Sequence, residues 1–147
     1  FAAPIRAFAF GFARVGSGEG LDRQTAAAMR QIYAAATSHP FLVGGTGSFD
    51  SEAMKIFNGE LMSKGGAMGV CCGYIAPLKL GYALKCDDGN KDASETMVSS
   101  LLLAIARPDA RQSEFLLKRQ NKIFKNYREL EVATLHPAPV ATPKSEL

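Results

Sequence analysis

Hydrophobic positions recur at helical spacing along the first third of the chain. Four apolar residues of the first segment fall on one helical face: Ile5, Phe8, Phe12 and Val15. A second helix is predicted over residues 22–36, with three apolar residues facing inward: Ala28, Ile32 and Ala35. His39 precedes Pro40, and a residue before proline avoids the helical region, so this helix should end there.

The middle of the chain alternates between apolar and polar residues, which is typical of strands. Three strands are predicted, over residues 60–64, 68–75 and 80–86, with a hairpin turn over 76–79 between the last two. A short helix over 51–57 should precede them. The pattern therefore predicts an α+β fold, in which a small antiparallel sheet is flanked by helices.

Helical periodicity returns after Asn90. Asp92 and Glu95 have the spacing of a capping box. The predicted buried stripe of this helix contains five residues: Ala93, Met97, Leu101, Ala104 and Ile105. Pro108 should end it, and a last helix is predicted over 109–127. We expect three parts: a domain over 1–107, an additional helix within 108–130, and a flexible Pro-rich tail over 131–147.

Composition excludes several classes of protein. The chain has 147 residues, 47% hydrophobic and 21% charged, which fits one ordinary globular domain. A net charge of +3 is too small to indicate a nucleic-acid or membrane partner. No apolar run reaches the roughly 20 residues of a membrane helix. The three cysteines form no CxxC pair, which favours a reducing, cytoplasmic setting.

Lys64 is the strongest candidate for chemistry. It ends a predicted strand and is followed by Gly65 and Gly66, which would let a ligand approach closely. A lysine followed by a glycine at a strand end also resembles the Lys-Thr-Gly element of serine β-lactamases. A lysine on a short strand is otherwise an ordinary solvated edge residue.

The glycine-rich segment over 44–48 has three possible interpretations. Consecutive amides before a helix can cradle a phosphate, a tight connection can require positive φ, or the loop can line a substrate pocket. Gly45, Thr46, Gly47 and Asp50 are the candidate substrate-binding residues. Asp50 also suits the first turn of the following helix, where a carboxylate is favourable.

The remaining polar residues suggest weaker candidates. Asp87 and Asp88 could bind a metal, but an Asp-Asp-Gly turn before a helix more commonly caps it. The basic residues within 111–128 indicate a solvated helix face, with nucleic-acid binding as a minor alternative. His39 and His136 lack metal-ligand spacing.

Four short motifs together resemble a known family. They are His39-Pro40, Val43-x-Gly45-Thr46-Gly47-x-Phe49-Asp50, Lys64-x-Gly66-Ala67-x-Gly69 and Leu84-Lys85-x-x-Asp88-Gly89. In this order they resemble the C-terminal half of the rhizobial-type (thermolabile) L-asparaginases. The resemblance covers residues 1–105, and nothing after Asp109 contributes to it.

The resemblance implies a fold related to serine β-lactamases and glutaminases, and hydrolysis of L-asparagine to aspartate and ammonia. In that family a Ser-x-x-Lys pair supplies the nucleophile, and a second serine pairs with the lysine that matches Lys64. Asp50 stands where some members have a cysteine near the pocket.

The family's cysteines help to bind zinc, but Cys71, Cys72 and Cys86 do not match those ligands. We therefore expect no metal in this chain, although the full-length protein could hold zinc.

The serines of the family lie upstream of the positions matched here. The chain begins at Phe1 inside a predicted helix, so we expect a fragment that is inactive alone. The expected partner is L-asparagine, with neither nucleic acid nor membrane, and the full-length protein should form a homodimer. The alternative is a degenerate paralogue that acts as a binding or oligomerisation module.

Overall fold

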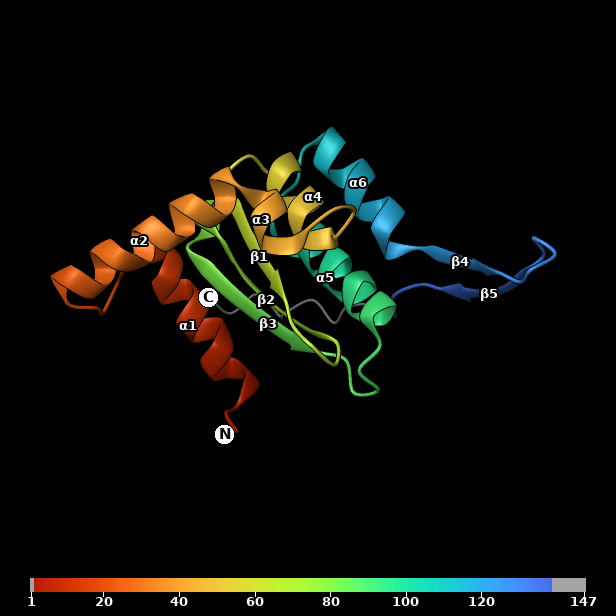
Figure 1. The fold of residues 1–147 in the computed structure, drawn as a ribbon, viewed down its shortest axis with the longest axis horizontal. Helices are drawn as coiled ribbons and strands as arrows, with labels where there is room; N and C mark the ends of the chain where they lie inside the picture. The colour runs from red at the N-terminus through yellow and green to blue at the C-terminus, as the bar shows by residue number, and fades with distance from the viewer. Residues whose placement is uncertain (1, 139–147) are drawn as a thin grey trace. The chain divides into compact units, whose positions relative to one another are not determined.

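The computed structural model describes residues 2–138, and these form two compact units (Figure 1). The first unit runs to Ser94 and the second begins at Glu95, inside one helix. The first unit contains α1 (Ile5–Ser17), α2 (Arg23–Ser38), α3 (Pro40–Gly44), α4 (Phe49–Ile56), β1 (Leu61–Gly65), β2 (Val70–Ile75), the 3-10 turn η1 (Ala76–Leu78) and β3 (Leu80–Lys85). Helix α5 (Lys91–Ile105) crosses the boundary, and α6 (Ala110–Gln120), β4 (Lys122–Lys125) and β5 (Glu131–Leu135) follow. The α+β class is confirmed.

The three predicted strands form one antiparallel sheet in the order β1-β2-β3. Lys64 of β1 lies opposite Cys72 of β2, which lies opposite Ala83 of β3. Each observed strand agrees with its predicted range within two residues at either end. The turn between β2 and β3 is closed by Lys79, which adopts a left-handed conformation with φ 49°.

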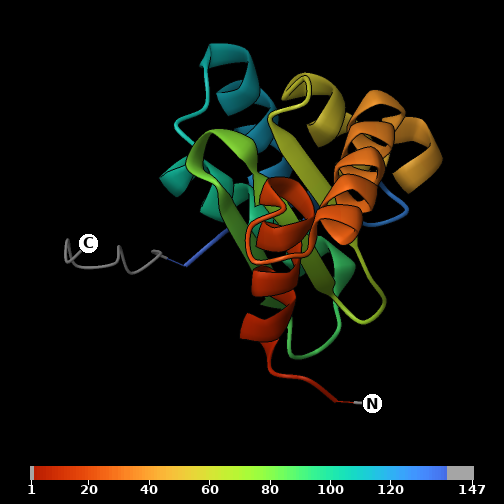
Figure 2. The same ribbon diagram turned by 90° about the vertical axis from the view of Figure 1, so that its left-hand side faces the viewer.

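Helices α1 and α2 pack on one face of this sheet (Figure 2). The buried core there is centred on Met54, Met62 and Tyr74. Gly81 is required because a Cβ on it would lie 2.0 Å from the carbonyl oxygen of Ala9 in α1. The backbone of α1 therefore approaches β3 closely.

The predicted inward faces of α1 and α2 need correction. Phe12 and Val15 pack against the core as expected, whereas Ile5 and Phe8 are about half exposed. In α2 the predicted residues Ala28, Ile32 and Ala35 are all exposed. The residues of α2 that face the interior are instead Ala26, Tyr33 and Ala36, each one or two positions along the chain from a predicted residue.

Two helix starts also differ from expectation. Pro40 begins α3 rather than a loop, as proline is favourable in the first turn of a helix. At the start of α5, the side chain of Asn90 accepts a hydrogen bond from the Ala93 amide at 2.9 Å. This Asx-type cap replaces the predicted capping box of Asp92 and Glu95.

The buried stripe of α5 was predicted on the wrong face. Met97 is 40% exposed and Ala104 is exposed, whereas Val98 and Leu102 are fully buried. The polar residues Ser94, Glu95, Thr96, Ser99 and Ser100 are also buried. A stripe chosen by hydrophobicity alone could not include these polar positions.

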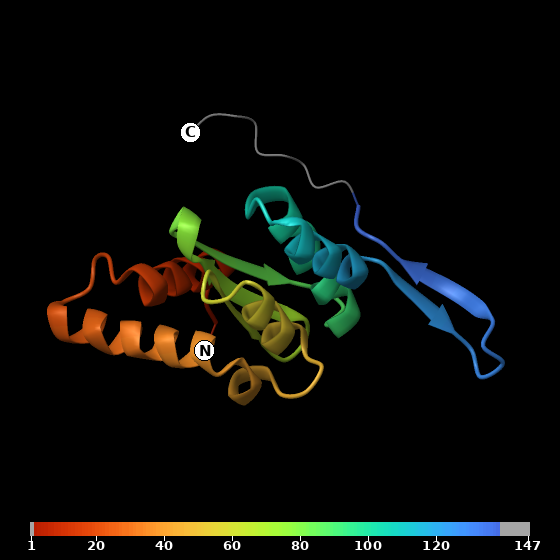
Figure 3. The same ribbon diagram turned by 90° about the horizontal axis from the view of Figure 1, so that it is seen from above.

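The predicted helix over 109–127, within the 108–130 part, is wrong beyond Gln120. There the chain forms β4 and β5, an antiparallel hairpin that extends from the end of α6 (Figure 3). The Asn126 side chain closes its turn by accepting from the amides of Arg128 and Leu130. The predicted tail over 131–147 therefore begins with a strand, and its residues 139–147 lie outside the described part of the chain.

Candidate functional site

Lys64 lies near the end of β1 with its side chain exposed. Its Nζ donates a hydrogen bond to the carbonyl oxygen of Gly65 at 2.7 Å. The predicted strand-end position is thus confirmed. The ammonium group is held against the backbone of the very next residue, and it can reach solvent and any ligand there.

The glycine-rich segment forms a turn between α3 and α4. Gly45 and Gly47 have φ of 78° and 68°, a region that side-chain-bearing residues rarely adopt, so the tight-connection interpretation holds for both. The loop borders a pocket of about 390 Å³. Its lining consists of Pro40, Phe41, Gly45, Thr46, Gly47, Ser51, Glu52 and Lys55.

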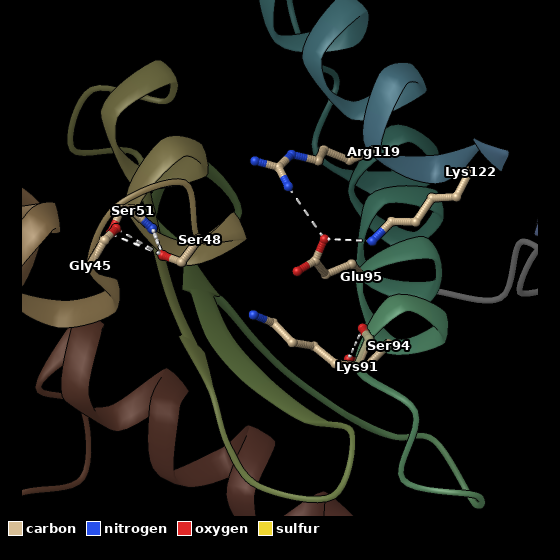
Figure 4. A network of polar contacts seen from close by, with 8 residues as sticks. All are labelled: Gly45, Ser48, Ser51, Lys91, Ser94, Glu95, Arg119 and Lys122. Atoms are coloured by element: carbon tan, nitrogen blue, oxygen red, sulfur yellow. Dashed lines mark hydrogen bonds and ion pairs between the residues drawn. The ribbon is translucent and has the colours of Figure 1, made fainter. Parts of the chain in front are cut away.

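Two serines hold this loop onto α4 (Figure 4). The Ser48 hydroxyl accepts a hydrogen bond from the Ser51 amide at 3.2 Å and thereby caps the helix. The Ser51 hydroxyl donates to the carbonyl oxygen of Pro40 at 2.9 Å. Ser48 therefore fixes the end of the loop to α4, and Ser51 ties α4 to the start of α3; the sequence did not single out either side chain.

Asp50 is nearly buried, with 9% of its surface exposed, and both of its oxygens accept hydrogen bonds. Oδ1 accepts from the Ser63 hydroxyl at 2.6 Å, and Oδ2 accepts from the Gly65 amide at 2.6 Å. These short distances are typical of charge-assisted hydrogen bonds. Asp50 therefore joins the first turn of α4 to the end of β1.

The interior next to Asp50 holds a thiol and a phenol. The Cys71 sulfur lies 3.8 Å from the Ser63 hydroxyl. Burial, and then the negative charge of Asp50, raises the pKa of the Cys71 thiol from 9.0 to about 12. Burial also raises the pKa of the Tyr82 phenol well above its usual value. Both groups are neutral at physiological pH, so neither is a reactive nucleophile.

The structure brings the candidates together in two places. Gly45, Thr46 and Gly47 line the loop pocket, whose lining, within residues 2–138, includes neither Asp50 nor Lys64. Asp50 and Lys64 instead meet at Gly65, which each of them contacts. Ser63 was missed because nothing in its local sequence reveals a contact with a residue 13 positions earlier.

Asp87 and Asp88, the candidate metal ligands, lie in the turn before α5. Within 2–138 there is no group of three or more His, Cys, Asp or Glu side chains that could hold one. Asp88 instead accepts from the Asn90 amide at 2.8 Å and from the Cys86 thiol at 3.0 Å. These hydrogen bonds, the thiol's foremost, lower the pKa of Asp88. Asp88 thus shapes the turn before α5.

A second nearly buried carboxylate lies in the other unit. Glu95 accepts from Lys122 at 2.9 Å and from Arg119 at 3.5 Å (Figure 4). The side chains of both cations are less than a quarter exposed. The basic residues of this region therefore include two that neutralise an internal charge, rather than only a solvated face.

The chain was also compared with known protein families and curated proteins. The family model described as L-asparaginase II matches residues 1–137. This match includes residues 106–137, where the sequence motifs gave no resemblance. A search of curated proteins finds no match. None of the described helices is both long and apolar enough to cross a membrane.

Proposed function

Because the chain belongs to the L-asparaginase II family, we propose that Lys64 takes part in the hydrolysis of L-asparagine to L-aspartate and ammonia. Family membership itself indicates an asparaginase-type hydrolase and a small-molecule substrate. The observation that carries the finer proposal is the exposed ammonium group of Lys64 at a glycine-flanked strand end. The same strand end carries the family-like motif.

The proposed chemistry is acyl transfer through a serine. The serine oxygen attacks the side-chain amide carbon while its hydroxyl proton passes to the amine of Lys64, a step that requires the amine to be unprotonated. In the extended protein the lysine of the Ser-x-x-Lys pair, placed beside Lys64, would keep one of the two amines neutral. Lys64 then returns this proton to the departing nitrogen, which leaves as ammonia. Water cleaves the resulting ester to release aspartate and restore the serine.

No serine of this strand end suits the nucleophile. Ser63 has no exposed surface, and its hydroxyl donates to Asp50. This burial supports the proposal that the nucleophile comes from an upstream portion of the protein and that this chain alone is inactive. The proposal includes zinc only for such a full-length protein, and no step here depends on it.

The loop pocket is the proposed place for substrate contacts. Gly45, Thr46 and Gly47 line this pocket, and a glycine-rich turn is a common place for the carboxylate of an amino acid to approach the backbone. Asp50 was predicted as a substrate-binding residue as well. Its hydrogen bonds to Ser63 and Gly65 support a role in positioning the end of β1 instead.

A non-catalytic role is the second candidate, and one observation favours it. Helix α1 exposes three large apolar side chains, Ile5, Phe8 and Phe10, which are 46–58% exposed. A surface of this kind suits a protein partner. Under this alternative the chain is a binding or oligomerisation module that has lost turnover.

The proposed setting is the cytoplasm. The cysteines Cys71, Cys72 and Cys86 are all free, which supports a reducing compartment. We further propose a homodimer for the full-length protein, with no nucleic-acid or membrane partner.

Ammonia release tests the catalytic proposal. A version of the chain extended upstream from the native transcript should release ammonia from L-asparagine, and Lys64→Met should abolish this turnover without unfolding the protein. Lys79→Met is the matched control, because Lys79 is an exposed lysine whose ion pair with Glu19 lies at the surface. Wild-type activity in the Lys64→Met variant would exclude the proposed role of Lys64.

A further inference from the structure

We propose that Asp50 is a positioning residue, which holds Lys64 in place through the two residues that flank it. The structure shows the hydrogen bonds of Asp50 to Ser63 and Gly65. The catalytic importance of Lys64 rests on the proposed function. Under this proposal Asp50 does not contact the substrate. It acts on the end of β1, and this distinguishes it from the loop residues.

The first link runs through Gly65. Its amide donates to Asp50 Oδ2 at 2.6 Å, and its carbonyl oxygen accepts from Lys64 Nζ at 2.7 Å. Both polar groups of Gly65 are therefore engaged, one by each side chain. A change in the position of Asp50 moves the carbonyl against which the ammonium group is held.

The second link runs through Ser63. Its hydroxyl donates to Asp50 Oδ1 at 2.6 Å, and its side chain has no exposed surface. Thus the residue before Lys64 and the residue after it are tied to the same carboxylate. Two hydrogen bonds, one buried and one partly buried, therefore fix the backbone on either side of this exposed lysine.

The local sequence explains why an aspartate suits this position. Asp50 lies in the first turn of α4, whose Ser48 cap fixes the helix start, and a negative charge is favourable there. Gly65 lies so close that a Cβ on it would be 3.1 Å from Asp50 Oδ2. A side chain at position 65 would crowd the carboxylate, so a glycine there lets Asp50 approach the backbone amide closely.

A strand at the edge of a sheet has backbone N–H and C=O groups that no neighbouring strand pairs with. The amide of Gly66 donates to Val70 across the hairpin at 2.8 Å, whereas the amide of Gly65 faces away from β2. Since β1 is at the edge of the sheet, this outward amide needs an acceptor from elsewhere. Asp50 supplies it.

Hydrogen exchange and side-chain relaxation by NMR on the 147-residue chain test this inference without requiring turnover. Asp50→Ala removes both acceptors, and we expect the Gly65 amide to exchange about tenfold faster, the size of effect that one lost hydrogen bond gives. The Lys64 side-chain carbons should become more mobile. Asp50→Asn keeps one neutral acceptor, the amide oxygen, so its effects should be intermediate.

Ser51→Ala is the matched control. Ser51 is also a nearly buried polar residue in the first turn of α4, but its hydroxyl bonds Pro40 instead of β1. This variant should lower stability without a selective change at Gly65 or Lys64. If Asp50→Ala does not fold, Asp50→Asn and Ser63→Ala decide the question with the same measurements.

Two results would overturn the inference. One is a Gly65 amide and a Lys64 side chain that behave alike in wild type and the Asp50 variants. The other is acceleration at Gly65 no greater than that of the average amide, because this would reflect general destabilisation. A Lys64→Met variant that keeps activity would refute only the proposed function, and the NMR result would stand independently.

Kinetics on the upstream-extended version separate positioning from substrate binding. Asp50→Asn should lower kcat about tenfold, with KM changed by less than about twofold, because a misplaced proton carrier slows chemistry and leaves substrate binding intact. A raised KM with unchanged kcat would instead make Asp50 a substrate-binding residue and would contradict the inference.

Discussion

The two units each bury a carboxylate, and they satisfy it in different ways. Asp50 in the first unit is held by a hydroxyl and a backbone amide, which are both neutral donors. Glu95 in the second unit is held by the cations Lys122 and Arg119. Both carboxylates are less than a tenth exposed, so burial alone does not distinguish them.

This difference indicates what each carboxylate does. Neutral donors fix the direction of the groups that bond to Asp50, and those groups are the backbone and side chain on either side of Lys64. The cations at Glu95 compensate its charge and join α5 to α6 and β4 within the second unit. The first arrangement orients a candidate site, whereas the second maintains local structure.

The largest expected effect on stability is at Asp50. Asp50→Ala should lower the free energy of unfolding by about 3 kcal/mol, because it leaves the buried Ser63 hydroxyl and the Gly65 amide without their acceptor. Urea denaturation followed by circular dichroism measures this loss. A loss below about 0.5 kcal/mol would mean that water replaces the carboxylate as acceptor. Asp50 would then not fix the groups around it, and the proposed difference between Asp50 and Glu95 would be wrong.

The next effect is at Glu95. Glu95→Gln should cost about 2 kcal/mol, since two partly buried cations lose their counter-charge. Adding Lys122→Met should recover part of this loss, because removing both partners leaves one fewer uncompensated charge. Additive losses in this double-mutant cycle would indicate that Glu95 and Lys122 are not coupled.

The smallest effect concerns pH and the thiol next to Asp50. The pKa of Cys71 is raised to about 12 by burial first and by the Asp50 charge second, so the unfolded chain loses this proton at lower pH than the folded chain. The associated stability is complete below pH 9.0 and declines as the pH rises towards 12. Between about pH 9 and pH 10, wild type should lose about 1 kcal/mol more than Cys71→Ala. Parallel pH profiles for the two proteins would show that Cys71 does not titrate differently on folding.

Much of the first unit could be predicted from the sequence, because its signals are local. Alternation and turn residues give the three strands within two residues of their observed ends. The position of Lys64 at the end of β1 follows from the same pattern. The role of Asp50 does not, because its partner Ser63 is brought to it by tertiary structure.

The second unit was predicted less well for physical reasons. In α5 the buried polar residues, Glu95 among them, shift the interior stripe away from the apolar positions. After Gln120 helical periodicity continues in the sequence, but Asn126 closes a turn and the segments on either side pair as strands. The β-branched residues Val132 and Thr134 favour a strand there, but the proline-rich composition that follows obscured this signal.

We propose that Lys64 contributes to an asparaginase site whose nucleophile is supplied from an upstream segment. The most direct test measures ammonia release from L-asparagine and L-glutamine by the 147-residue chain and by the upstream-extended version. We expect release from L-asparagine by the extended version only. No release by either version, with both well folded, would contradict the proposed catalytic role and favour the binding module. Turnover by the 147-residue chain alone would show that the nucleophile lies within these residues.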